Sequence, residues 1–209
     1  LSAYWNRIRL MRARRIWDYK PSHRALSRSD VDSRLQAPDR CFVAYDLLVP
    51  IYKNSQDLEQ LLKSLLQDPP IYARRIVLSD DASDDHQVSE LLARYSQSES
   101  RAVTVKQPRN LGFSQNVTQG LKACLERVVV VLNTDTWVPK GSLDRLAAHF
   151  SSNEKIAAIC PLSNKAAFAT LAPPHQAKSL TIEDLSAVDA YLAKAPQFLT
   201  KVPFASGFC

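Results

Sequence analysis

Glycine is scarce in this 209-residue chain. The four glycines are Gly112, Gly120, Gly141 and Gly207, and no two of them lie closer than eight residues. The glycine-rich phosphate loops GxGxxG and GxxxxGK[ST] both need a closer spacing, so the sequence excludes them. If the chain binds a phosphorylated nucleotide, a metal ion or basic side chains must neutralise the phosphates.

Cysteine is equally sparse and lacks a metal-binding spacing. Cys41, Cys124, Cys160 and Cys209 form no CxxC pair, and the four histidines are also scattered. This pattern argues against a zinc site. It favours free, buried thiols in a reducing compartment.

Long apolar runs are missing as well. No run reaches the ~18–20 residues that a membrane span needs. The first fifteen residues carry five arginines with no apolar block behind them, which is unlike a signal peptide. We therefore expect a cytoplasmic protein, with the inner face of the membrane as an alternative location. Because the chain starts at Leu1 rather than Met, we also expect residues upstream of it.

The positive charge is concentrated in residues 1–40. This segment holds ten Lys/Arg and four Asp/Glu, whereas residues 41–209 hold 17 of each. The neutral remainder argues against a nucleic-acid surface built into the fold. Residues 1–40 read as a basic helical or linker segment. They could join an upstream domain of the same polypeptide or rest on an anionic membrane, and the irregular apolar spacing favours the first reading.

Residues 41–209 alternate between strand and helix patterns. This rhythm predicts one α/β domain with a mostly parallel sheet and helices on both faces. The expected strands are Cys41–Pro50, Ile76–Ser79, Val103–Lys106, Val128–Leu132, Ile156–Cys160 and Val202–Cys209. The expected helices are Leu58–Leu66, Val88–Tyr95, Ser114–Leu125, Ser142–Phe150 and Ile182–Ala193, with a long loop over Pro161–Leu180.

Acidic residues follow two of the expected strands. The four-valine run beginning at Val128 ends in Asn133-Thr134-Asp135, and the second strand ends in Ser79-Asp80-Asp81. The carboxyl ends of parallel strands share one edge, so both acidic segments could face the same crevice. A carboxylate there suits a divalent cation that carries a phosphate-rich ligand. Farther along the second segment, we expect Ser83, Asp84 and Asp85 to form a solvated turn and a helix N-cap.

The order of these motifs resembles the GT-A-fold family 2 glycosyltransferases, which are inverting enzymes that use nucleotide-diphosphate sugars with Mn²⁺ or Mg²⁺. The resemblance rests on VPIYKN (49–54), DDASDD (80–85), RNLGF (109–113) and NTDT (133–136), each after a strand, and covers about residues 43–209. The segments CPLSNKA (160–166) and ASGFC (205–209) also resemble the bacterial O-antigen or rhamnosyltransferase branch.

The resemblance implies a donor site on four segments. Residues 50–52 would line the base and ribose pocket, Asp80 would contact the base with Asp81 beside it, and residues 109–112 would approach the nucleotide and sugar. Asp135 would meet the metal and diphosphate as the last residue of a DXD motif. The implied site residues are Pro50, Ile51, Tyr52, Asp80, Asp81, Arg109, Asn110, Gly112, Asn133, Thr134 and Asp135.

Three departures from the family pattern affect this expectation. The first DXD position is Asn133, which leaves one protein carboxylate for the metal, and Thr118 stands where the family often has Asn. The family's Glu-Asp-x-Asp-type motif, which supplies the general base, has no counterpart up to Cys209. Asp184 and Asp189 read as surface residues of a helix. We therefore expect the base to lie beyond Cys209, and we expect this chain to bind donor but to transfer sugar poorly or not at all.

Two other functions stay open at this stage. A nucleotidyltransferase-like domain has a similar sheet, but such enzymes usually carry a glycine-rich loop after the first strand, where this chain has residues 50–54 without glycine. A non-catalytic nucleotide-binding module could retain the sheet as a scaffold. The resemblance itself implies a UDP-, dTDP- or GDP-linked sugar as donor, and a glycan or lipid-linked acceptor.

Overall fold

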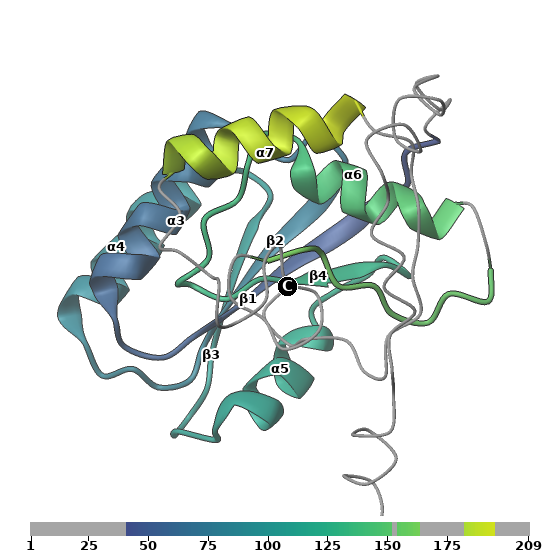
Figure 1. The fold of residues 1–209 in the computed structure, drawn as a ribbon. Helices are drawn as coiled ribbons and strands as arrows, with labels where there is room; N and C mark the ends of the chain where they lie inside the picture. The colour runs from purple at the N-terminus through teal and green to yellow at the C-terminus, as the bar shows by residue number, and fades with distance from the viewer. Residues whose placement is uncertain (1–40, 152–153, 164–181, 195–209) are drawn as a thin grey trace, which may run out of the picture.

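The computed structural model describes residues 41–151, 154–163 and 182–194, and Figure 1 shows their arrangement. Helices and strands alternate up to residue 148, as the sequence predicts. The elements are β1 (Tyr45–Ile51), α3 (Ser55–Gln67), β2 (Ala73–Asp80), α4 (His86–Ser98), β3 (Ala102–Lys106), α5 (Phe113–Leu121), β4 (Val129–Val131), α6 (Ser142–Ala148), the short 3₁₀ helix η1 (His149–Ser151) and α7 (Ile182–Lys194).

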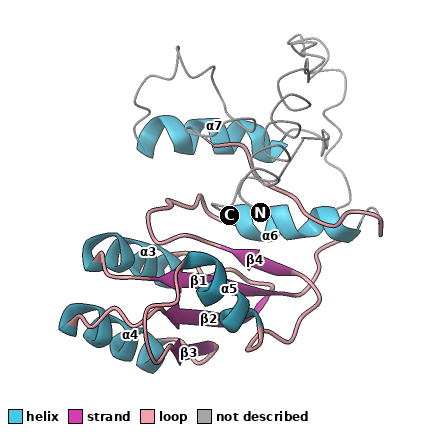
Figure 2. Cartoon of the chain, turned by 90° about the horizontal axis from the view of Figure 1, so that it is seen from below, coloured by secondary structure: helices cyan, strands magenta, loops and turns pink. Residues whose placement is uncertain are grey.

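The four strands form one parallel sheet in the order β3-β2-β1-β4. From β1 the chain moves outward through α3 to β2 and through α4 to β3, then returns through α5 to β4 on the other side of β1. Crossovers between parallel strands are right-handed, so the reversal of direction places α5 on the opposite face from α3 and α4. Figure 2 shows α5 on one side of the sheet and the other two helices on the other.

The main core lies between the sheet and the helices α3, α4 and α6. Side chains alternate across a strand, and Tyr45, Leu47, Val49 and Ile51 of β1 all enter this core. On α3 the buried leucines are residues 58, 61, 62 and 65, the i, i+3, i+4, i+7 spacing of one helical face. Burial on both faces of the sheet therefore explains the apolar run over residues 47–51 of β1.

The opposite face is covered closely by the short helix α5. A Cβ placed on Gly120 would lie 2.5 Å from Leu48 Cδ1 and 3.1 Å from Ser79 Cβ. Only glycine allows this helix to approach β1 and β2 so closely. The helix ends at Leu121, earlier than the sequence predicts, and the backbone N–H groups of Leu125 and Glu126 beyond it donate to the buried Asp46 carboxylate.

The predicted fold class is confirmed, and four of the six expected strands are present in the described residues. The fifth, Ile156–Cys160, is wrong, because these residues adopt no regular structure. Ala157 and Ala158 are exposed, so this short run buries too little side chain to hold a strand in the sheet. The sixth, Val202–Cys209, lies outside the described residues, as do residues 1–40 and most of the predicted loop over Pro161–Leu180.

The last described helix, α7, lies outside α6 and away from the sheet (Figure 2). Arg145 of α6 forms an ion pair with Asp189 of α7. Asp184 is exposed, as expected, whereas Asp189 is partly buried by this pair. Within the described ranges, no helix is both long enough and apolar enough to cross a membrane.

Candidate functional site

The predicted site segments follow the carboxyl ends of all four strands, which share one edge of the sheet in Figure 1. Pro50 and Ile51 are the last two residues of β1, and both are buried. Tyr52 comes next, and its side chain is 48% exposed. An exposed aromatic ring therefore follows β1 directly at this edge of the sheet.

Asp80, the last residue of β2, is 3% exposed, and its contacts are local. Its Oδ1 accepts hydrogen bonds from the backbone N–H of Ser83 (3.0 Å) and from the Ser83 hydroxyl (2.5 Å). Both hydrogen bonds found at this carboxylate thus go to one oxygen. Its other oxygen, Oδ2, takes no part in them.

Asp81 connects three strand ends. It is 2% exposed; its N–H donates to the Ile51 carbonyl at 2.8 Å, and its two carboxylate oxygens accept from the N–H groups of Leu111 (2.7 Å) and Gly112 (2.8 Å). The predicted segments after β1, β2 and β3 are thereby brought into direct contact. Hydrogen bonds to a charged carboxylate are stronger than those between neutral groups, so Asp81 fixes this loop firmly.

Four non-glycine residues with positive φ lie in the two loops after β1 and β2. They are Lys53 (56°), Asn54 (53°), Ala82 (53°) and Asp84 (48°), and they are all such residues in the described part of the chain. Left-handed backbone is uncommon for residues with a Cβ and costs energy. Such strain concentrates at functional sites, where the surrounding structure holds it in place.

Basic side chains accompany these loops. The Lys53 ammonium lies 5.2 Å from the centre of the Tyr52 ring, within the range of a cation–π contact. Arg109 and Asn110, which precede the Asp81-bound loop, are exposed. Gly112 has φ +80°, and a Cβ added to it would meet no atom within 4 Å, so the backbone is open to close approach there. Positive charge and an accessible backbone together suit an anionic ligand.

The segment after β4 forms a turn at the same edge. Leu132 N–H still donates to the Leu48 carbonyl at 2.9 Å, Asn133 and Thr134 are half-buried, and Asp135 is exposed. Among the residues that the structure describes, no three His, Cys, Asp or Glu side chains gather as a complete metal site. An exposed carboxylate near an amide does fit a hard cation that keeps water and takes further oxygens from a phosphate ligand.

A buried polar cluster behind this edge was not predicted from the sequence. Asn116 of α5 is 2% exposed; its Oδ1 accepts from the Ser79 hydroxyl at 2.7 Å, and its Nδ2 donates to the Ser79 carbonyl at 2.9 Å. Gln107 Nε2 lies 3.4 Å from both side chains. Asn116 lies four residues before Gly120, so the two share one face of the helix, and this spacing could have indicated the cluster. Thr118, where the family often has Asn, is exposed and bonds to the Ser114 carbonyl.

The expectation for Ser83, Asp84 and Asp85 is confirmed in part. Asp85 is the N-cap of α4, because its side chain accepts from the N–H groups of Gln87 and Val88, and Asp84 is exposed. The prediction of a solvated Ser83 is wrong, since it is 1% exposed. Its hydroxyl donates to Asp80 and accepts from Lys53 N–H at 2.8 Å, which draws it beneath the loop after β1.

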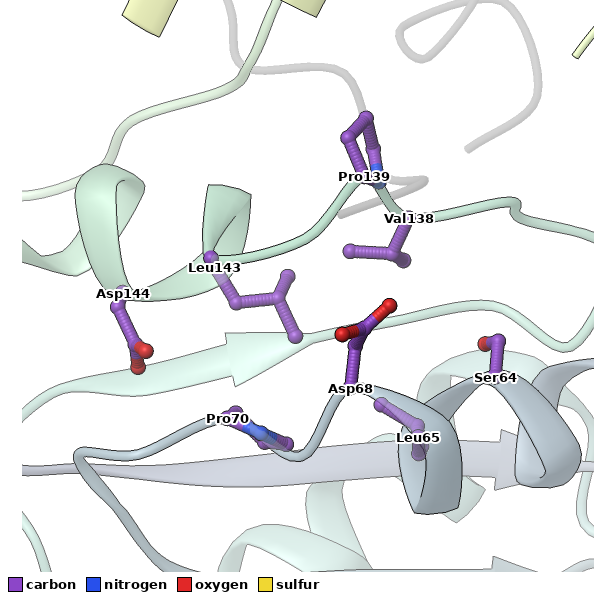
Figure 3. Close-up of a pocket in the computed structure, with 9 residues that line it drawn as sticks. Ser64, Leu65, Asp68, Pro70, Val138, Pro139, Leu143 and Asp144 are labelled. Carbon is purple, nitrogen blue, oxygen red and sulfur yellow. The ribbon is translucent and has the colours of Figure 1, made fainter. Parts of the chain in front are cut away.

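The hollow drawn in Figure 3 lies at the opposite, amino edge of the sheet. Its volume is about 10 Å³, which is room for one water at most. Asp144 lines it and is already saturated, accepting from the Tyr45 hydroxyl at 2.8 Å and from the N–H groups of Ile71 (3.0 Å) and Tyr72 (3.2 Å). This hollow therefore cannot hold a nucleotide.

Cysteine chemistry is also unfavourable near that amino edge. Burial, with a smaller effect of the nearby Asp46 charge, raises the pKa of the Cys124 thiol to about 11. The thiol therefore stays protonated at neutral pH and is a poor nucleophile. Neither the hollow nor this cysteine competes with the carboxyl edge as the functional site.

Comparison with known proteins gives one family model and a number of partly similar solved structures, two of which are described below. The family model described as "Glycosyl transferase family 2" matches residues 46–209. No curated protein in the comparison matches the chain. The structure of S. aureus TarS 1–349 in complex with UDP-GlcNAc has a TM-score of 0.46 and 23% identity, over 54% of this chain and 32% of that one.

A second solved structure is the mannosyltransferase PcManGT from Pyrobaculum calidifontis in complex with GDP-Man and Mn²⁺. It has a TM-score of 0.49 and 16% identity, over 64% of this chain and 41% of that one. This chain thus covers less than half the length of either solved chain. The family model covers most of the chain, from the second residue of β1 onward. On that match, the protein belongs to glycosyl transferase family 2.

Proposed function

We propose that the carboxyl edge of the sheet binds a nucleotide-diphosphate sugar together with Mn²⁺ or Mg²⁺, and that the sugar is transferred with inversion to a glycan or lipid-linked acceptor. The observation that carries the proposal is the contact of three predicted segments through Asp81, within the residues that the family model matches. The family match favours this function over a nucleotidyltransferase.

In this proposal the base and ribose lie against Pro50, Ile51 and Tyr52. Tyr52 offers an exposed ring for stacking. Asp80 is the better candidate to accept a hydrogen bond from the base, because both hydrogen bonds found on its carboxylate go to Oδ1. Both oxygens of Asp81 already hold the loop of Leu111 and Gly112.

The diphosphate and sugar lie nearer to the segments after β3 and β4. Arg109 and Asn110 are exposed and can turn toward the phosphates and the sugar, while Gly112 leaves its backbone accessible. Asp135, with Asn133 and Thr134 before it, would hold the metal. A bound divalent cation neutralises the charge that develops on the leaving diphosphate. An inverting transfer also needs a general base for the acceptor hydroxyl, and we assign that role to no described residue.

Calorimetric titration with UDP, dTDP and GDP, each with Mn²⁺ and with a chelator, tests this proposal. At least one nucleotide should bind in a Mn²⁺-dependent manner. Asp135→Asn should weaken that binding by at least about tenfold, as is usual for groups that hold a metal. Glu90→Gln, the same charge change on the exposed surface of α4, should leave it unchanged. Equal nucleotide affinity in wild type and Asp135→Asn would contradict the assignment of Asp135 to the metal site.

A further inference from the structure

Ser83 occupies a central place between the two strained loops. It is 1% exposed, its N–H and hydroxyl both donate to Asp80 Oδ1, and its hydroxyl oxygen accepts from the Lys53 N–H at 2.8 Å. A single hydroxyl thus connects the end of β2 to the loop after β1. Because the hydroxyl proton is directed at a carboxylate, the oxygen is oriented to accept.

The hydrogen bond from Lys53 N–H to Ser83 is made at a residue whose backbone conformation is unfavourable. Lys53 and Asn54 are consecutive residues at φ 56° and 53°. Left-handed backbone is unfavourable for each such residue with a Cβ, so two in succession need support. Asn54 is supported from the helix side, where its side chain caps α3. On the strand side, the support for Lys53 is the hydroxyl of Ser83.

The backbone at Lys53 in turn determines what the edge presents. Tyr52 precedes it with an exposed ring, and the Lys53 ammonium lies 5.2 Å from the centre of that ring. If the Lys53 N–H lost its acceptor, residues 53 and 54 could relax toward negative φ. The side chains of Tyr52 and Lys53 would then move. Ser83 itself is too buried to touch a ligand, so any effect on binding must pass through its partners, which are Lys53 with Tyr52 on one side and Asp80 on the other.

We infer that Ser83 is a positioning residue for the nucleotide: its hydroxyl holds the left-handed backbone of Lys53 and so sets Tyr52 and Lys53 for the base and phosphates. This inference rests on the proposed function, because it needs a nucleotide at this edge. It does not need sugar transfer.

The first test measures the Lys53 amide directly, beginning with the wild type. Hydrogen exchange measured by NMR on the 209-residue chain should show a protected Lys53 amide, since that N–H is hydrogen-bonded to a buried oxygen. In Ser83→Ala the Lys53 amide should lose its protection. The variant should still fold, because the Ser83 backbone N–H keeps its bond to Asp80. An unprotected Lys53 amide in wild type would overturn the inference.

The second test measures affinity for whichever of UDP, dTDP or GDP binds with Mn²⁺. Ser83→Ala should weaken it about five- to tenfold, the ratio expected for losing one hydrogen bond. Ser83→Thr, which keeps the hydroxyl, should restore both affinity and amide protection. Ser89→Ala is the matched control, because its exposed hydroxyl bonds only to the Asp85 carbonyl of its own helix turn, and it should bind like wild type.

The outcomes separate the two proposals. If wild type binds none of the three nucleotides, the proposed function fails and the role of Ser83 falls with it. If wild type binds but a folded Ser83→Ala binds equally well, only the role of Ser83 is overturned. If Ser83→Thr binds as weakly as Ser83→Ala, the hydroxyl is not what positions the site, and the inference fails on that point.

Discussion

The two edges of the sheet differ in the side chains and the backbone that they leave exposed. At the amino edge, two buried carboxylates are bonded to the protein: Asp144 accepts three hydrogen bonds and Asp46 accepts two backbone N–H groups. The partly buried Glu99 pairs with Arg101. At the carboxyl edge, Asp80 and Asp81 are also buried and bonded, but Tyr52 and Asp135 are exposed beside loops whose backbone is strained.

This difference shows which carboxylates are available to a ligand. A buried carboxylate that already accepts several hydrogen bonds stabilises the fold, and removing it leaves its partners unpaired. An exposed carboxylate contributes little to stability and is free to bind. The acidic residues of this chain look alike in the sequence. Burial and hydrogen bonding separate those that hold the fold, such as Asp144 and Asp81, from the exposed Asp135 that a ligand can reach.

Asp144→Ala should produce the largest loss of stability. It removes the acceptor of the Tyr45 hydroxyl and of two backbone N–H groups at a buried carboxylate, so we expect a loss of about 3 kcal/mol in the free energy of unfolding by urea. Asp68→Ala is the control: Asp68 lines the same hollow, but its pair with Lys140 is exposed and should contribute less than about 1 kcal/mol. Equal losses would contradict the contrast between buried and exposed carboxylates.

Two glycines of the α5 region should separate stability from binding. Gly120→Ala forces a methyl against Leu48 and Ser79, and we expect it to cost about 1–3 kcal/mol by urea denaturation while the folded protein keeps its nucleotide affinity. Gly112→Ala meets no atom, but its φ of +80° suits glycine, so it should disturb the loop at the carboxyl edge. Nucleotide titration should therefore show a larger effect for Gly112→Ala. The reverse order of affinities would show that the loop of Gly112 is not part of the site.

The pair of Glu99 and Arg101 should give the smallest effect, and one that depends on pH. The Arg101 hydrogen bond lowers the pKa of the Glu99 carboxyl below its ordinary value of 4.5. Because the folded pKa is depressed, this stabilisation is fully present above about pH 4.5 and is lost as the pH falls through the folded pKa.

Urea denaturation between roughly pH 6 and pH 3 checks this expectation. Glu99→Gln should lower stability at pH 6 by no more than about 1–2 kcal/mol, and the difference from wild type should shrink as the pH falls. Glu59→Gln is the control, since its pair with Lys63 is exposed, and it should change the profile less. A constant difference for Glu99→Gln across this range would show that the ion pair is not its source.

The sequence predicted the fold class and the first four strands because their signals are local. Apolar runs such as that of β1 and the leucine spacing of α3 identify buried elements directly. It also placed Asp80, Asp81 and Asp135 correctly at strand ends. The predicted strand at Ile156–Cys160 was wrong, because a short run of small apolar residues says nothing about whether a neighbouring strand pairs with it.

The contacts between loops could not be predicted in the same way. Nothing in the spacing of Asp81 and Leu111, thirty residues apart, indicates that one accepts a hydrogen bond from the other. Ser83 reads as a turn residue in the sequence, and its burial depends on the path of the loop after β1. Asn116 depends on which face of α5 meets the sheet. These features follow from tertiary packing, which local sequence patterns do not indicate.

The central claim is that nucleotide and metal bind at the carboxyl edge, and Mn²⁺-induced line broadening in NMR tests it most directly. The two edges are roughly 20 Å apart along β1, by the rise of a seven-residue strand. With Mn²⁺ and the nucleotide that binds, the amide signals of Lys53, Gly112 and Asp135 should broaden strongly, whereas those of Ile71, Tyr72 and Glu126 should persist. Broadening centred on the amino edge would contradict this account.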